Sequence, residues 1–174
     1  MADLHGKNSG VITMKQIKID KQFFIKIGMV LFLLAYLILI YTADSAKNVS
    51  MDQITASMEK EETLTALLKR GRTDLKRYYQ MNEDATEGYL FYKAISPMAV
   101  EELLIVKAPD KQKANTFLEN AQAHLDSQKK VFQGYGTDQM GLLNEAFVES
   151  KGNYVIYACG SDAAKWREHF LSLI

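Results

Sequence analysis

The feature that most constrains this chain is an uninterrupted apolar run near its N-terminus. Residues 27–43 (IGMVLFLLAYLILIYTA) contain no charged side chain, and residues 23–25 lengthen the apolar stretch to about 20 residues. A helix of about 20 residues, rising about 1.5 Å per residue, crosses a hydrocarbon core about 30 Å thick. Lys26 lies within this stretch, close enough to its end for the long side chain to reach the lipid headgroups. The run therefore predicts a transmembrane helix over residues 23–43, in contact with the lipid bilayer.

Two other interpretations of the run remain. A buried core helix of a soluble protein would normally present a polar face to water, which this run lacks. A cleavable signal peptide usually has a shorter apolar region, of about 7–15 residues, and the exit sequence Tyr41-Thr-Ala-Asp-Ser-Ala46 is a mediocre processing site. No cysteine follows the run for lipid attachment until Cys159. An uncleaved signal anchor is the interpretation that the length of the run favours.

The charges on either side of the run predict its orientation. Residues 1–26 carry five lysines against two aspartates, and the first charged residues after the run are mostly acidic: Asp44, Lys47, Asp52 and Glu59. Basic flanks stay on the cytoplasmic side of a membrane. We therefore predict a single-pass protein of the cell membrane. Its segments are a cytoplasmic tail at residues 1–22, the membrane helix, a short polar stalk at residues 44–50 and an extracytoplasmic domain at residues 51–174.

The composition of the part after the membrane helix limits its partners. Residues 48–174 carry 15 basic and 18 acidic side chains. A mildly acidic domain lacks the basic surface with which proteins neutralise phosphates, so we predict no nucleic-acid partner. Cys159 is the single cysteine, which excludes an intramolecular disulfide and a thiolate-rich metal site. We predict that the domain is stabilised by its own core and needs no cofactor.

Hydrophobic periodicity after residue 50 alternates between helical and strand spacing. Helical spacing appears between Met51 and Gly71, at residues 72–81, from Pro109 to Phe132 and from Ser161 to Leu173, and strand-like segments are residues 88–95, 101–107, 142–150 and 153–159. Strand pairs joined by a helix cannot form an all-parallel sheet. We therefore predict an α+β domain of two layers, a mainly antiparallel four-stranded sheet with helices packed on one face.

Four segments of the chain resemble a known family. They are Asp74-Leu-Lys-Arg-Tyr-Tyr79, Glu101-Glu-Leu-Leu-Ile-Val-Lys107, Gln128-Lys-Lys-Val-Phe-Gln-Gly-Tyr135 and Lys151-Gly-Asn-Tyr154. In them the chain is similar to an uncharacterised domain of unknown function found in small lipoproteins and membrane-anchored proteins of the Gram-positive bacterial envelope. The resemblance implies a bacterial, outward-facing domain, in which the membrane helix replaces the lipidated cysteine. It supplies no activity and no catalytic residues.

The residues able to carry catalysis do not form a known motif. His124 and His169 lack a second histidine or a carboxylate at a metal-ligand spacing such as His-Glu-x-x-His. Cys159 ends an apolar strand, where a thiol behaves as a small hydrophobic group. Glu101 and Glu102 are adjacent strand residues, whose side chains point to opposite faces. The sequence thus predicts no catalytic residue and no metal ligand.

Tyrosines are concentrated in the predicted domain. Tyrosine covers apolar surface while keeping a hydroxyl for hydrogen bonding, which enriches it at recognition surfaces. If helices cover one sheet face, the other can present tyrosines, and the candidate interaction surface consists of Tyr89, Tyr92, Tyr135, Tyr154 and Tyr157. Ordinary core packing is the alternative for these rings.

The functional hypothesis is a non-enzymatic binding or protein-interaction module of the cell envelope. Its partner would be another envelope protein, a wall polymer or a small ligand. An envelope enzyme that hydrolyses peptidoglycan or peptides is one alternative, for which a cleft gathering His124 or His169 with carboxylates would be needed. A structural spacer of a membrane assembly is the other.

Overall fold

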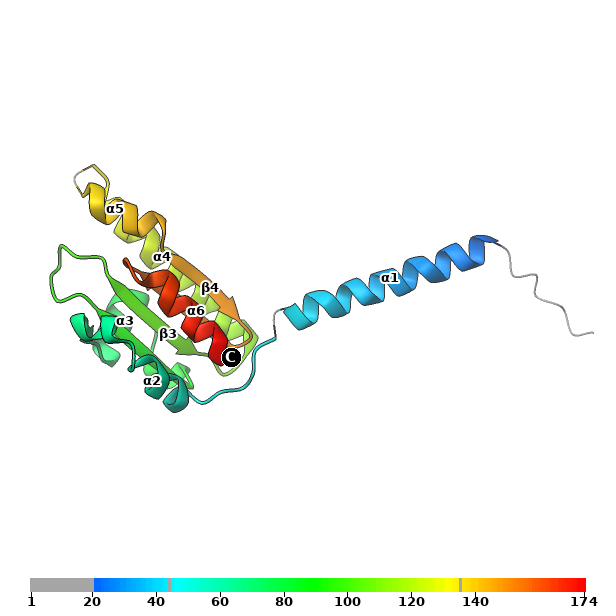
Figure 1. The fold of residues 1–174 in the computed structure, drawn as a ribbon, viewed down its shortest axis with the longest axis horizontal. Coiled ribbons are helices and arrows are strands. Elements are labelled where there is room, and N and C mark those ends of the chain that lie inside the picture. Colours follow the sequence, from blue (N-terminus) through cyan, green and yellow to red (C-terminus); the bar gives the residue numbers. More distant parts are fainter. Residues whose placement is uncertain (1–20, 44, 135) are drawn as a thin grey trace, which may run out of the picture. The chain divides into compact units, whose positions relative to one another are not determined.

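The computed structural model describes residues 21–43, 45–134 and 136–174. Most of the predicted tail (residues 1–20), Asp44 and Tyr135 lie outside the described residues. The chain divides into two compact units, residues 1–43 and residues 44–174 (Figure 1).

The first unit contains the helix α1 (Lys21–Ala43). Its segment Gln22–Leu39 is 18 residues long, and none of that segment is buried within the protein. Large apolar side chains are exposed along it, among them Phe24, Phe32 and Leu39. Within the described residues, α1 is one helix long and apolar enough to cross a membrane, in agreement with the helix predicted from the apolar run.

The second unit is an α+β domain built on an antiparallel sheet, as predicted. The sheet has five strands rather than the predicted four, in the order β1-β2-β3-β5-β4. The strands are β1 (Leu68–Lys69), β2 (Gly88–Lys93), β3 (Glu102–Lys107), β4 (Phe147–Lys151) and β5 (Tyr154–Cys159). The β2–β3 and β4–β5 hairpins are joined through the central pairing of β3 with β5.

The additional strand comes from a segment that was predicted to be helical. The helix α2 (Met51–Met58) ends early, and a 3₁₀ turn, η1 (Glu62–Ala66), separates it from β1. The leucine spacing that suggested one helix is misleading, because Leu64 is buried whereas Leu68 is exposed. The chain is extended there, and the Arg70 N–H donates to the Phe91 carbonyl of β2 over 2.8 Å.

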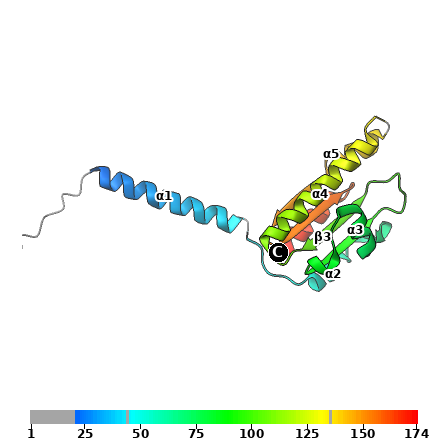
Figure 2. The ribbon, with the colours of Figure 1, turned by 180° about the vertical axis from the view of Figure 1, so that it is seen from behind.

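Helices cover both faces of the sheet, which corrects the prediction that they pack on one face. One core includes Phe91, Leu104 and Tyr157 of the sheet, beneath α3 (Arg72–Tyr79), α4 (Lys111–Phe132) and α5 (Thr137–Asn144). The other includes Leu103, Ile105 and Ile156, beneath α2 and α6 (Ala163–Leu173). Figure 1 shows α6 in front of the sheet, and Figure 2, from behind, shows α4 in front of it.

The burial of β3 explains the second helical layer. All six residues of β3 are buried, and a strand apolar on both faces needs cover on both. The predicted strand at residues 142–150 is also corrected, because its first part belongs to α5 and β4 begins at Phe147. The short helical segment η2 (Glu83–Ala85) precedes β2.

The segment predicted as a stalk lies against the domain. Val49 and the Tyr154 hydroxyl exchange two hydrogen bonds, of 2.8 Å and 2.6 Å. Lys107 Nζ donates to the Asn48 side-chain oxygen over 2.7 Å. At the β4–β5 turn Gly152 has φ +57°, and a Cβ there would lie 2.9 Å from that of Ala46. Residues 46–49 are therefore seated on this end of the sheet.

Candidate functional site

A cluster of charged and polar side chains lies inside the core between the sheet and α4. Glu102 is fully buried. Its Oε1 accepts a hydrogen bond from the Tyr79 hydroxyl over 2.6 Å. Its Oε2 is paired with Lys93 Nζ and lies 3.2 Å from His124 Nε2. We call Tyr79, Lys93, Glu102 and His124 the buried polar cluster.

The fold brings these four residues together from four elements. Lys93 and Glu102 are register partners across β2 and β3, so both side chains lie on the same sheet face. Tyr79 is the last residue of α3, and His124 is on the buried side of α4. The Tyr79 and His124 rings lie 4.5 Å apart between their centroids, and His124 lies 5.4 Å from the ring of Tyr157.

Glu102 is the carboxylate of the cluster, and the hydroxyl and thiol groups near it are neutral. Burial raises the pKa of Glu102, but the hydrogen bond from His124 and the charge of Lys93 outweigh it and leave the pKa below its ordinary value. Burial raises the pKa of Tyr79 and of Tyr157 well above their ordinary value, and the charge of Glu102 adds to the shift. Burial likewise raises the pKa of Cys159 to about 12. Glu102 is therefore ionised at neutral pH, whereas both phenols and the thiol keep their protons.

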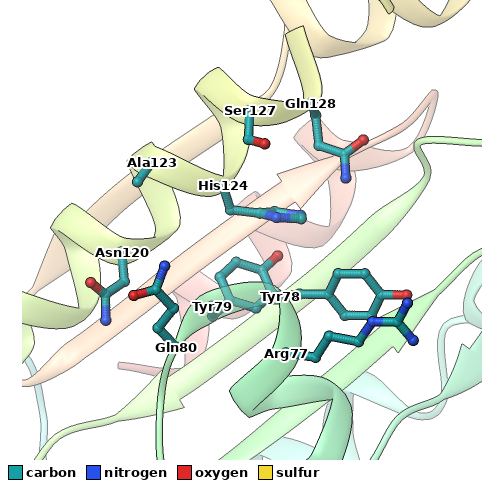
Figure 3. A pocket seen from close by; sticks show the side chains of 9 residues that line it. All are labelled: Arg77, Tyr78, Tyr79, Gln80, Asn120, Ala123, His124, Ser127 and Gln128. Carbon is teal, nitrogen blue, oxygen red and sulfur yellow. The ribbon is translucent and has the colours of Figure 1, made fainter. Parts of the chain in front are cut away.

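A hollow of about 270 Å³ opens from this cluster between α3 and α4. Figure 3 shows side chains of both helices pointing into the space between them; the lining residues are Arg77, Tyr78, Tyr79, Gln80, Asn120, Ala123, His124, Ser127 and Gln128. His124 and Tyr79 belong to both the cluster and the lining. We call this space the α3–α4 hollow.

Part of the polar lining of the hollow is left open to a ligand. Within the described residues, no hydrogen bond to the protein is made by the side chains of Gln80, Asn120, Ser127 and Gln128. Gln80 also has φ +54°, a left-handed conformation that favours glycine. Gln80 is the C-cap of α3, a position where helices commonly end in this conformation, and its side chain borders the hollow.

Comparison with known proteins identifies the family. A family model described as a domain of unknown function (DUF4358) matches residues 60–160, more than half of the chain. The chain belongs to the DUF4358 family. No curated protein and no solved structure matches it. The DUF4358 region contains the whole buried polar cluster and the whole α3–α4 hollow. This agrees with the family resemblance seen in the sequence.

The structure does not bring the four described tyrosines of the predicted interaction surface together on an open face. Tyr154 and Tyr157 are buried, on opposite faces of β5, because each face has its own helical layer. Tyr89 and Tyr92 are half-buried in β2 and also point to opposite faces. Tyr135 lies outside the described residues. The open tyrosine face is therefore corrected, and two of its residues are core residues.

The second histidine lies in a different arrangement, at the contact between α2 and α6. Ser57 Oγ lies 2.9 Å from His169 Nε2, and His169 Nδ1 lies 2.6 Å from Glu61 Oε1. The hydrogen bond from Lys165 lowers the pKa of Glu61. A serine, a histidine and a carboxylate in this order resemble an activated nucleophile. Both Ser57 and His169 fall outside the DUF4358 region.

The position of Ser57 in its helix disfavours stabilisation of an oxyanion. Ser57 is in the last turn of α2, where backbone N–H groups are engaged in helical bonds, such as Glu59 N–H to the Thr55 carbonyl and Lys60 N–H to the Ser57 carbonyl. The C-terminal end of a helix also carries partial negative charge, which opposes an oxyanion. The geometry therefore fits a structural hydrogen-bond network between α2 and α6.

The part of the chain that the structure describes contains no set of metal ligands. No group of three or more His, Cys, Asp or Glu side chains there could hold a metal ion. The α3–α4 hollow instead offers hydrogen-bond donors and acceptors together with one guanidinium, from Arg77. Such a lining suits recognition of a polar ligand.

Proposed function

We propose that this DUF4358 protein is a single-pass membrane protein whose domain lies outside the cytoplasm and binds a small polar ligand in the α3–α4 hollow. The observation that carries the proposal is the convergence of polar side chains without protein partners over a buried ion pair. The ligand would come from the cell envelope, the compartment that an outward-facing domain samples. The interaction site thus differs from the tyrosine surface expected from the sequence.

The membrane placement rests on α1 and its flanking charges. α1 exposes apolar side chains from Phe23 to Leu39, which water would oppose and lipid tails accept. Residues 1–26 carry five lysines against two aspartates, which favours a cytoplasmic N-terminus. We also propose that the protein is bacterial, as the family resemblance implies.

This topology has a direct test, because the single native cysteine is buried. Ser127→Cys places a thiol at the exposed rim of the hollow, and Ala2→Cys places one in the N-terminal tail. A membrane-impermeant maleimide added to intact cells should label Ser127→Cys and leave Ala2→Cys unlabelled until the cells are lysed. The reverse pattern would refute the outward-facing domain.

Ligand binding is supported by three properties of the hollow. It joins a solvent-exposed rim to a buried, hydrogen-bonded floor at His124 and Tyr79. Its volume of about 270 Å³, just below the range of about 300–1,000 Å³ of drug-sized sites, suits a ligand smaller than a drug molecule. Gln80, the left-handed C-cap residue of α3, adds a polar side chain to the exposed rim.

Photo-crosslinking can test the site while the identity of the ligand is still open. Ala123 is exposed and lines the hollow, whereas Glu119, one turn earlier on α4, is exposed outside the lining. A benzoylphenylalanine is placed at each position, in separate variants, and irradiated in membranes of the source cells. Intact-mass analysis should show discrete small-molecule adducts at position 123 and none at position 119. Absence of adducts from both variants, or equal adducts in both, would overturn the proposed site.

The serine arrangement supports a second candidate function, acyl transfer at Ser57. Ser57, His169 and Glu61 have the distances of a nucleophile, a base and an orienting carboxylate. A fluorophosphonate probe would then label wild-type protein at Ser57 and fail to label His169→Ala. We favour the binding module, which predicts no such labelling, because Ser57 lies at the wrong end of a helix for oxyanion stabilisation.

A further inference from the structure

We propose that the ligand of the α3–α4 hollow is a short peptide whose free α-carboxylate is bound by Arg77. This inference rests on the proposed function and names the chemical class of its ligand. It follows from three features of the lining: an unpaired guanidinium, the absence of a free aromatic face, and amide side chains spaced along α4.

The guanidinium of Arg77 is the charged group available to a ligand. Within the described residues Arg77 has no acidic partner, and its guanidinium lies 5.6 Å from the centre of the Tyr78 ring. The lining contains no carboxylate, and the nearby Glu102 is already paired with Lys93 and His124. An anionic group entering the hollow therefore meets one positive charge and no competing negative charge. The fork of an arginine matches the two oxygens of a carboxylate.

The aromatic rings of the lining are already engaged. Two cations, Arg77 and Lys93, lie over the Tyr78 ring, the second at 5.2 Å from its centre. Phe91 and His124 pack edge-on against the same ring. Tyr79 is buried within the polar cluster. A saccharide or a nucleobase, which gains affinity by stacking on an exposed aromatic face, finds no such face here.

The amide side chains match the groups of a peptide backbone. Gln80, Asn120 and Gln128 each offer donors and an acceptor, as a peptide unit does. Asn120 and Gln128 are eight residues apart on α4, a rise of about 12 Å along the helix axis. Three extended residues span about 10 Å. A tripeptide laid along α4 therefore covers most of the distance between these two amides, and in our proposal its carboxylate is turned toward Arg77 on the α3 side of the hollow.

The test compares three probes on the full-length protein in detergent micelles. The probes are trialanine with a free carboxylate, trialanine amide, and diacetylchitobiose, and binding is measured by saturation-transfer NMR and titration. The free acid should bind about tenfold or more tightly than the amide, since the bidentate charged contact is lost in the amide. Diacetylchitobiose should show no saturable binding.

Two arginine variants assign the difference to one side chain. Arg77→Gln should remove the preference for the acid over the amide. Arg72→Gln is the matched control, because Arg72 starts the same helix, is exposed, and lies outside the hollow. It should leave the preference unchanged. Arg77→Lys should keep only part of the preference, because an ammonium cannot form the paired contact.

The outcomes separate this inference from the proposed function. Equal affinity for acid and amide, binding of diacetylchitobiose alone, or binding of none of the probes would overturn the peptide-carboxylate proposal. Small-molecule adducts at position 123 would in that case still support a binding module with a different ligand. Loss of those adducts would overturn both.

Discussion

Removing the charge of Lys93 should destabilise the domain by about 3 kcal/mol. Lys93→Met keeps the length of the side chain and leaves Glu102, which is fully buried, without its cationic partner. Breaking a buried ion pair from one side costs about 3–5 kcal/mol. The lower end applies here, because the Tyr79 hydroxyl and His124 still contact the carboxylate.

Urea unfolding of the full-length protein in mild detergent measures this cost. Trp166 is the single tryptophan, is buried, and belongs to the core on the opposite face of the sheet, so the substitution does not touch the fluorescent probe. With a denaturant slope of about 1.5 kcal/mol per M, a loss of about 3 kcal/mol lowers the urea midpoint by about 2 M.

Two further variants isolate the buried charge as the cause. Lys107→Met is the matched control: Lys107 also ends a strand and is buried, but its partner Glu87 is 45% exposed, so the loss should be about 1 kcal/mol or less. Adding Glu102→Leu to Lys93→Met removes the stranded carboxylate and should recover most of the lost stability. A midpoint shift below about 0.5 M for Lys93→Met, or additive losses in the double variant, would refute the reasoning.

Three other properties can be checked on the same preparation. Gln80→Gly relieves the left-handed strain at φ +54° and should raise the unfolding free energy by about 0.5–1 kcal/mol while weakening trialanine binding; a loss of stability would contradict the strain. Folding lowers the pKa of Glu102, so the contribution of its carboxylate to stability is complete above about pH 5 and is lost as the pH falls through the folded pKa. The urea midpoint should therefore be constant from pH 7 to about pH 5 and decrease at lower pH. A midpoint that rises on acidification would contradict this sign. Cys159, buried and with its pKa raised to about 12, should react with a thiol reagent only at the rate of unfolding; rapid labelling of the native protein would disprove its burial.

The parts of the fold with a single strong period were predicted correctly. The stripe of apolar residues after Pro109 gave α4 nearly to its ends, because one face of a long helix repeats many times. Strands β2, β3 and β5 were recognised from aromatic and branched residues. The extended strand β1 was missed because two residues carry no period, and its existence depends on pairing with β2.

The prediction of helices on one sheet face was wrong because it did not use the apolar residues on both faces of the central strands. A strand that is apolar at every position reports two covered faces, and β3 has the sequence Glu-Leu-Leu-Ile-Val-Lys, apolar through its centre. Its neighbour β5, Tyr-Val-Ile-Tyr-Ala-Cys, has the same character. These two strands contained the signal for helices on both sides, and that second helical layer removes the open tyrosine face.

The buried polar cluster was missed for a different reason. Glu102 was judged against Glu101, its neighbour in sequence, although its partners come from other elements. The useful signal was a pair of opposite charges that face each other across one hairpin, Lys93 in β2 and Glu102 in β3. His124, between apolar positions of α4, is the helical counterpart of that signal.

The location of this cluster bears on why a domain of this size would keep it. A buried ion pair stabilises a fold little more than apolar residues of the same volume would, so stability alone does not account for Lys93 and Glu102. Both residues act on His124 and Tyr79, which form the floor of the α3–α4 hollow: Glu102 contacts both, and Lys93 compensates its charge. Replacing the pair by Met and Leu would leave the domain folded while His124 loses its partner. Under our proposal, the double variant would therefore recover most of its urea midpoint and lose affinity for the ligand, whereas a purely structural cluster would leave ligand binding unchanged.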